Sequence, residues 1–272
     1  MEKKKRMMSV TIGADIELFL KERNSNRIVS AEGLILGTKH EPFNFDPSNK
    51  FFATSLDNVL AEFCVPPVSI LDKEGFFNNI MKSIEYINKT IPADLCTIAT
   101  PAAMLEDVFL QTENAQLFGC EPDYNVWLRD INPKPEAVEQ SLRSAGGHIH
   151  VGWEEEGGVA LETRELLIKC MDLHIGVPSV LQEPDNKRKE LYGKAGAFRI
   201  KDYGAEYRTV SNYYAGDKTL TDWIVRATQH AINKVNDGFD IDAYGEEIQQ
   251  AINNNDKTVA MNLINALELE MA

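Results

Sequence analysis

Cysteine is scarce in this sequence of 272 residues. The four cysteines are Cys64, Cys96, Cys120 and Cys170, and no two of them form a Cys-x-x-Cys pair. Reduced thiols in a cytoplasmic protein fit this usage best, and structural burial is the role that we expect for each.

Long apolar runs and an excess of positive charge are also missing. Apolar stretches stay far below the about 18 residues that a membrane-spanning helix needs, and the charged start, Met1–Arg6, is not followed by the apolar core of a secretory signal. The sequence has 42 acidic against 28 basic residues, a net charge of −14. Because nucleic-acid-binding surfaces are normally basic, we expect neither a nucleic-acid partner nor a membrane.

Hydrophobic periodicity predicts strands scattered among helices, without regular β-α-β alternation. The predicted strands are Ser9–Lys21, Arg27–Ser30, Leu56–Val65, Leu95–Thr100, Ser144–Trp153, Phe198–Arg199 and Gly204–Val210. The predicted helices are one capped by Asp72 and running through Ile87, then Leu161–Leu181, Thr221–Val235, Asp242–Asn253 and Lys257–Met271. The predicted loops are Phe118–Trp127, Asp130–Pro135 and Glu183–Gly196, the last of them mobile. The pattern predicts an α+β fold with a mainly antiparallel sheet, organised as a single domain over residues 1–272.

The first predicted strand carries two acids, Asp15 and Glu17, two positions apart. Such a spacing places both carboxylates on the same face of a strand, where they repel each other. A hard divalent cation, Mg²⁺ or Mn²⁺, would relieve that repulsion. An exposed acidic strand edge is the alternative interpretation.

Two later strands add candidate ligands. Glu62 shares its predicted face with Leu60 and Cys64, so its carboxylate is drawn towards the interior and needs a partner. His148 and His150 point the same way from the predicted strand Ser144–Trp153, and the glycines that flank them would let a metal ion or a phosphate approach closely.

A fourth segment combines acidic and basic residues. Glu206 and Arg208 share one strand face, and Arg199 and Lys201 share a short run just before them. A carboxylate can bind a metal ion while guanidinium groups bind phosphate or carboxylate oxygens. The alternative is a cross-strand ladder of salt bridges. If the four segments converge on one sheet face, they could hold two metal ions, a triphosphate and an acidic substrate.

The order of these motifs resembles that of the glutamine synthetase and glutamate–cysteine ligase superfamily, and most closely its phage-type carboxylate–amine ligases. The order is an acidic-x-Glu strand, a later Glu-bearing strand, a Gly-rich His-x-His strand and a Glu-x-Arg strand, over about residues 13–214. The loop Gly119–Asn125 (GCEPDYN) and the run Tyr192–Arg199 also resemble segments of the phage-type ligases. Position 15 is Asp where glutamine synthetase has Glu, which shortens its reach.

The resemblance implies roles for individual residues. The metal ligands would be Asp15, Glu17, Glu62, His148 and Glu206. Arg208 would face the γ-phosphate or the substrate carboxylate, Arg199 would clamp phosphate, and His150, Lys201 and Lys194 would lie near the nucleotide. The fold would be a curved antiparallel sheet with helices on its outer face.

The implied activity is ATP- and Mg²⁺-dependent (or Mn²⁺-dependent) amide formation through an acyl phosphate. The partners would be a small-molecule or peptide carboxylate and an amine, and a homo-oligomer is left open. Three other classes stay open as well. They are a related phosphotransferase, a metal-dependent hydrolase that uses His148 and His150, and a non-catalytic binding protein on the same fold.

Overall fold

A long antiparallel sheet forms the centre of the molecule. The computed structural model describes residues 7–116, 123–132, 139–185 and 187–272, and within these ranges eleven strands form one sheet. Its path is β3-β4-β5-β1-β11-β13-β12-β8-β9, with β2 and β6 paired to β1. The bounds are β1 Met8–Glu22, β2 Ile28–Val29, β3 Phe43–Asn44, β4 Ala53–Asp57, β5 Leu60–Ser69, β6 Leu95–Ile98, β8 Tyr124–Asn125, β9 Asp130–Ile131, β11 Gly147–Glu154, β12 Ala197–Lys201 and β13 Gly204–Tyr207. Two further strands, β7 (Ala102–Met104) and β10 (Leu142–Ser144), pair separately.

Strand β1 confirms the predicted alternation. Its apolar side chains Ile12, Ile16 and Leu18 are fully buried in the main core. Since successive side chains of a strand point to opposite faces, Asp15 and Glu17 lie on the other face. Along the part of β1 that carries these acids its neighbours are β5 and β11, so the acids lie near the middle of the sheet.

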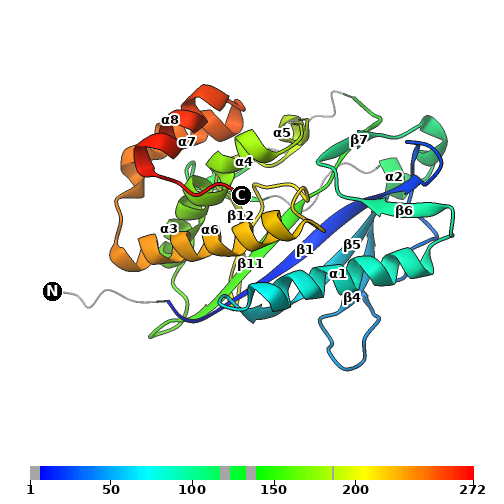
Figure 1. The fold of residues 1–272 in the computed structure, drawn as a ribbon, viewed down its shortest axis with the longest axis horizontal. Helices are drawn as coiled ribbons and strands as arrows, with labels where there is room; N and C mark the ends of the chain where they lie inside the picture. Colours follow the sequence, from blue (N-terminus) through cyan, green and yellow to red (C-terminus); the bar gives the residue numbers. More distant parts are fainter. Residues whose placement is uncertain (1–6, 117–122, 133–138, 186) are drawn as a thin grey trace.

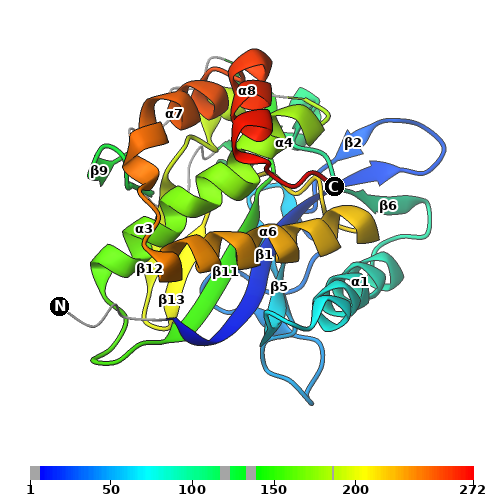
Figure 2. The same ribbon diagram turned by 60° about the vertical axis from the view of Figure 1, so that its left-hand side comes forward.

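Helices cover the apolar face of the sheet, as Figures 1 and 2 show for α1 and α6, which lie across β1, β5 and β11. Helix α1 starts after its cap Asp72, whose carboxylate accepts a hydrogen bond from the backbone of Gly75, and its Phe76 and Ile80 enter the core. The helices are α1 Lys73–Thr90, α2 Glu113–Gln116, α3 Leu161–Met171, α4 Val177–Gln182, α5 Arg188–Leu191, α6 Lys218–Asp237, α7 Gly245–Asn253 and α8 Lys257–Leu267. This arrangement confirms the predicted α+β class. No helix among the described residues is long and apolar enough to cross a membrane.

The predicted strand Leu56–Val65 is wrong in one respect, because it is a hairpin. Strand β4 ends at Asp57, the chain turns at Asn58 with φ of +54°, and β5 begins at Leu60. Asparagine tolerates this left-handed conformation better than other non-glycine residues. The prolines Pro66-Pro67 do not end β5, which continues to Ser69, past its last pair with β4 (Cys64 with Ala53). They lie where the pairing of β5 with β1 is irregular.

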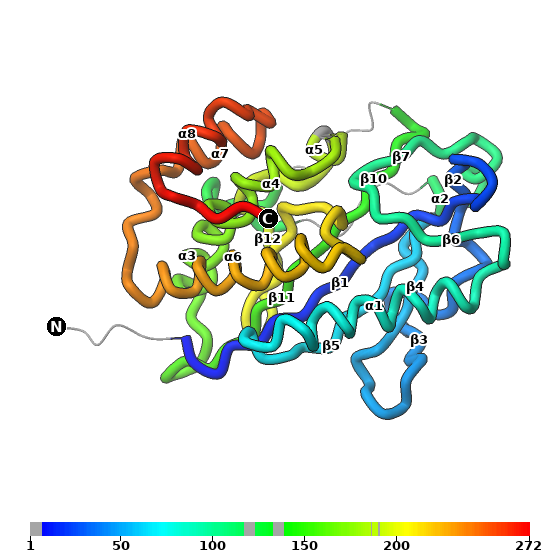
Figure 3. Tube along the Cα trace, viewed as in Figure 1, coloured from blue at the N-terminus to red at the C-terminus, as the bar shows by residue number. Residues whose placement is uncertain are grey.

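The predicted mobile loop Glu183–Gly196 contains the short helix α5, with Arg188 and Lys189 buried. The predicted helix Leu161–Leu181 is interrupted by a π-helical turn, Asp172–Gly176. The chain trace in Figure 3 shows α3 and α4 following one another through this turn. Half of the predicted loop Phe118–Trp127, including Cys120, lies outside the described residues, and the described half contains the short strand β8.

Candidate functional site

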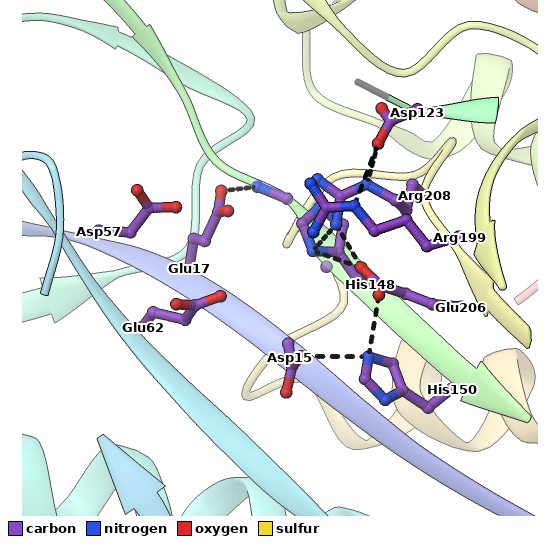
Figure 4. Close-up of polar contacts among 12 residues, drawn as sticks. Asp15, Glu17, Asp57, Glu62, Asp123, His148, His150, Arg199, Glu206 and Arg208 are labelled. Atoms are coloured by element: carbon purple, nitrogen blue, oxygen red, sulfur yellow. Dashed lines mark hydrogen bonds and ion pairs between the residues drawn. The ribbon is translucent and has the colours of Figure 1, made fainter. Parts of the chain in front are cut away.

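The sheet register collects the polar residues of the predicted segments on one face. Directly opposed residues of antiparallel strands project to the same side. The opposed pairs are Glu17–Glu62, Asp15–Cys64, Asp15–His148, His150–Glu206 and Glu206–Arg199. The four segments therefore meet on the sheet face opposite the helices, as Figure 4 shows.

Three carboxylates form an acidic cluster of Glu17, Asp57 and Glu62, with one oxygen of each within 4.8 Å of the others. Asp57 is the last residue of β4, so the turn into β5 brings it beside the other two. Few donors balance this cluster. The backbone N–H of Gly146 donates to Glu17 at 2.5 Å, Ser55 Oγ donates to Glu62 at 2.9 Å, and Lys39 Nζ lies 2.6 Å from Asp57 Oδ1.

Burial and the nearby negative charges raise the pKa values of two carboxylates of the acidic cluster, Glu17 and Glu62. Burial and the charge of Asp57 raise the pKa of Glu17 to about 7. Burial and the charges of Asp15, Glu17 and Asp57 raise the pKa of Glu62 to about 8. Closely spaced oxygen ligands with excess negative charge fit a hard divalent cation such as Mg²⁺.

In the other half of the site, the acidic and basic side chains pair with one another. Glu206 is buried, accepts a short hydrogen bond from Arg208, and lies 2.7 Å from Lys201 Nζ. Although burial raises it, the pKa of Glu206 lies well below its ordinary value because of Arg208 and the neighbouring histidines. Arg208 Nε also lies 2.6 Å from Asp123 Oδ1, and Arg199 Nε lies 3.7 Å from the same oxygen. We call Glu206, Arg208, Arg199, Lys201 and Asp123 the basic cluster.

The two histidines of β11 have different environments. His148 is buried, and Arg208 lies 3.1 Å from its Nδ1. Burial and the charge of Arg208 hold its pKa well below the ordinary value, so the ring is neutral. A Cβ atom at Gly146 would lie 2.2 Å from His148 Nε2, so the ring needs a glycine there.

His150 lies between acids and a phenol. Its Nε2 is 3.2 Å from Asp15 Oδ2 and 4.0 Å from Glu206 Oε2, and its Nδ1 is 2.7 Å from Tyr203 Oη. Burial lowers the pKa of His150, but the charge and hydrogen bond of Asp15 and the charge of Glu206 together outweigh this and raise it. Burial likewise raises the pKa of Asp15, and the pairing with His150 brings it below its ordinary value.

Both clusters line a cavity of about 480 Å³. Its walls include Glu17, Asp57 and Glu62 on one side and Arg199 and Arg208 on the other. A smaller cavity of about 50 Å³ adjoins it, because Glu17, Asp57, His148 and Arg208 line both. The larger one has the size of an ordinary small-molecule site.

Most of the predicted site residues meet here, but not as one ligand set. Only Glu17 and Glu62 belong to the acidic cluster, whereas Asp15 pairs with His150, and Glu206 pairs with cations. Among the described residues, Lys194 lines neither cavity, and its carbonyl oxygen lies 3.1 Å from Thr209 Oγ1. Its role as a phosphate contact stays a prediction.

Sequence reasoning missed Asp57, Asp123 and Lys39. Asp57-Asn58 is a turn-forming pair, and this signal could have divided the strand and placed Asp57 at the hairpin end. Asp123 belongs to the quoted loop Gly119–Asn125, but nothing local shows that it contacts Arg208. Lys39 reaches Asp57 from a distant loop without any pattern of its own.

Comparison with known proteins gives one finding for the C-terminal half of the chain. Residues 138–272 match the model of a family described as phage phiEco32-like COOH.NH2 ligase, type 2. The matched span holds His148, His150, Arg199, Glu206 and Arg208, whereas the acidic cluster lies before it. No curated protein matches the chain.

Proposed function

Because the chain belongs, by the match of its C-terminal half, to the phage phiEco32-like COOH.NH2 ligase family, type 2, we propose that it is an ATP- and Mg²⁺-dependent ligase that joins a carboxylate to an amine. The family's description names a ligase of carboxyl and amino groups. The nucleotide, the metal ion and the acyl phosphate intermediate are the parts that the proposal adds.

One observation carries this proposal: the acidic cluster and the basic cluster face each other across the same cavity. Phosphoryl transfer from ATP needs both kinds of group, because metal ions neutralise phosphate oxygens and guanidinium groups stabilise charge in the transition state. A surface ladder of salt bridges would not leave three carboxylates crowded together, with the pKa values of Glu17 and Glu62 raised.

Glu17, Asp57 and Glu62 would hold the divalent cation. When bound, the ion would supply a positive charge that binds phosphate oxygens and polarises the bond to the leaving ADP. Asp15, His148 and Glu206 stay proposed as further ligands. In the structure Arg208 and Lys201 hold Glu206, which makes the acidic cluster the better fit for a cation.

Arg208 is the residue best prepared to contact the transferred phosphoryl group. Its guanidinium is buried and fixed by Asp123, Glu206 and His148, so it needs little reorganisation during the reaction. Arg199 is partly exposed beside it and would bind the same or a neighbouring phosphate. Lys201 and His150 do not line the cavity themselves, but they pair with Glu206 and Asp15 and would add to the positive charge beside it.

The proposed reaction has two transfers. The substrate carboxylate oxygen attacks the γ-phosphorus of ATP, the bond to ADP breaks, and an acyl phosphate forms. The amine nitrogen then attacks the acyl carbon, inorganic phosphate leaves, and the nitrogen loses a proton to give the amide. The protein contributes positioning and charge neutralisation, and none of its own groups becomes covalently bound.

A hydrolase built on the His-x-His strand is less well supported. Within the part of the chain that the structure describes, the acidic cluster is the one group of three closely spaced potential ligands, and it contains no histidine. His148 contacts Arg208, and His150 contacts Asp15 and Tyr203.

The test is ATP turnover in the presence of Mg²⁺ and a panel of amino acids, peptides and amines, with products identified by mass spectrometry. The expected result is ADP, phosphate and an amide whose mass equals acid plus amine minus water. The proposal is overturned if the protein with Mg²⁺ binds no ATP, or if it hydrolyses an ester or amide without nucleotide.

A further inference from the structure

The interior behind the sheet contains a carboxylate that the proposed reaction does not use. Asp172 is fully buried at the start of the π-helical turn between α3 and α4. Burial raises its pKa to about 6, although several hydrogen bonds to the carboxylate oppose this shift. Buried charges are costly, so a carboxylate kept here needs a structural or functional reason.

The donors around Asp172 come from three separate segments. Trp127 Nε1–H donates to Oδ2 at 2.7 Å, and Tyr207 Oη–H donates to Oδ1 at 2.9 Å. Thr209 Oγ1 lies 3.1 Å from Oδ1 and equally far from the carbonyl oxygen of Lys194, and its single hydroxyl hydrogen can serve either. The backbone of Gly196 also hydrogen-bonds to the carboxylate.

Two of these donors flank Arg208 in the sequence. Strand β13 ends at Tyr207, so Arg208 lies just beyond the regular ladder, with its N–H donating to the carbonyl oxygen of Ala197. Because side chains alternate along an extended chain, Tyr207 and Thr209 point towards the helices while Arg208 points into the cavity. Asp172 therefore holds the backbone of Arg208 from the opposite side of the sheet.

The third donor, Trp127, lies four residues after Asp123, which is another partner of Arg208. Trp127 follows Asn125, whose side chain accepts hydrogen bonds from the backbone of Trp127 and Leu128. Asp123 lies two residues before Asn125 and pairs with Arg208 Nε at 2.6 Å. Both members of this ion pair are thus connected to the same buried carboxylate.

We propose that Asp172 is a positioning residue, which fixes Arg208 and Asp123 relative to each other so that the guanidinium faces the cavity. The proposal rests on the proposed function for the purpose of Arg208, but the geometry of the ion pair can be tested without it. The π-helical turn fits this role, because such turns occur often at functional sites.

The test compares Asp172→Asn with Glu155→Gln. Glu155 is a matched control, because it is also a buried carboxylate that accepts hydrogen bonds from a tryptophan (Trp153) and a threonine (Thr163), and it lines neither cavity. The probes are the ATP analogue AMP-PNP with Mn²⁺, and Mn²⁺ alone, by titration calorimetry. We expect Asp172→Asn to weaken analogue binding about 10-fold and Glu155→Gln to change it by less than about 2-fold. The affinity for Mn²⁺ alone should change by less than about 2-fold in both variants.

A double-mutant cycle separates positioning from general loss of structure. In an Arg208→Met background, Asp172→Asn should weaken analogue binding by less than about 2-fold more. An equal loss in both backgrounds, or no loss in either, overturns the proposal. If Asp172→Asn does not fold, Tyr207→Phe removes one donor only and should give the same pattern with a loss of about 3-fold.

A second readout does not depend on nucleotide binding. The Nε–H proton of Arg208, followed by ¹⁵N NMR, should exchange with water about 10-fold faster in Asp172→Asn than in the wild type. Its exchange rate in Glu155→Gln should equal that of the wild type. If the wild type binds no AMP-PNP, the proposed function fails and this exchange rate alone decides the role of Asp172. An unchanged exchange rate in Asp172→Asn overturns the positioning role of Asp172.

Discussion

The two clusters that face each other across the cavity differ in how their charges are compensated. In the acidic cluster Lys39 pairs with Asp57, and the pKa values of Glu17 and Glu62 rise to about 7 and about 8. In the basic cluster Glu206 has close cationic partners, and its pKa lies well below the ordinary value. The same sheet face thus holds carboxylates of opposite character.

The difference indicates which ligand each cluster suits. Crowded carboxylates are stabilised by an added cation, which replaces mutual repulsion with attraction. Arginines already fixed by carboxylates give a rigid positive surface for an anion, with little loss of side-chain entropy on binding. A metal–triphosphate complex carries both charges, and it fits a cavity with one cluster on each side.

The largest effect should come from breaking the basic cluster. Arg208→Met should lower ligase turnover by about 10³-fold or more, because a fixed arginine that stabilises a phosphoryl transition state contributes on that scale. Arg208→Lys keeps the charge but not the fork of donors, so we expect it to recover only part of the loss. The measurement is steady-state formation of ADP and amide.

Arg226→Met is the matched control for this experiment, since Arg226 lies on α6 and pairs with Glu270 away from the cavity. Its turnover should stay close to that of the wild type. Full activity of Arg208→Met would contradict the assignment of Arg208 to the transferred phosphate.

Breaking the acidic cluster should have a smaller effect: it should weaken metal binding and yet stabilise the metal-free protein. Glu62→Gln should weaken Mn²⁺ binding by about 10-fold or more, because one anionic ligand is lost. The same change should raise the melting temperature of the metal-free protein at pH 8, by roughly 2 °C per kcal/mol of repulsion removed. Glu22→Gln, at the partly exposed end of β1, is the control, and neither quantity should change in it.

The pH dependence of stability sharpens the comparison further. The folded-state pKa values of Glu17 and Glu62 lie above those of an unfolded chain, so protonation of these groups stabilises the folded protein. This stabilisation is fully present below about pH 4.5 and is lost as the pH rises through about 7 and about 8. The melting temperature of the metal-free protein should therefore fall between pH 6 and pH 8, with little further fall from these two groups at higher pH. A saturating divalent cation should reduce this fall, and the Glu17→Gln/Glu62→Gln double variant should lack it.

The smallest effect concerns the internal counter-ion of the acidic cluster. Lys39 is partly exposed, and its ammonium lies 2.6 Å from Asp57. Lys39→Met should tighten Mn²⁺ binding by about 2- to 5-fold, since a competing cation is removed from a partly solvated pair. Weaker binding of Mn²⁺ by this variant would show that Lys39 supports the cation site rather than competes for it. Titration calorimetry measures either outcome.

Local sequence pattern was enough to predict the faces of the central strands. The alternation in β1 separates Ile12 and Ile16 from Asp15 and Glu17, and the structure confirms that separation. Period-two spacing likewise placed His148 with His150 and Glu206 with Arg208. Once strands are antiparallel, their register brings such faces together, so the convergence of the four segments needed little further information.

The compensation of charge could not be predicted in the same way. Asp57 reaches the acidic cluster only through a tight turn at Asn58, and Asp123 and Lys39 reach the site from loops. Arg188 and Lys189 are buried in a short helix although their segment is strongly polar. These contacts depend on tertiary packing between residues far apart in sequence, for which a local pattern carries no signal.

The most direct measurement is anomalous X-ray diffraction from crystals of the protein soaked with Mn²⁺ and AMP-PNP. The account predicts an anomalous peak among the carboxylates of Glu17, Asp57 and Glu62, with a phosphate of the analogue between that peak and Arg208. A fully occupied analogue with no metal peak among these three carboxylates, or with its phosphates away from both clusters, would contradict it.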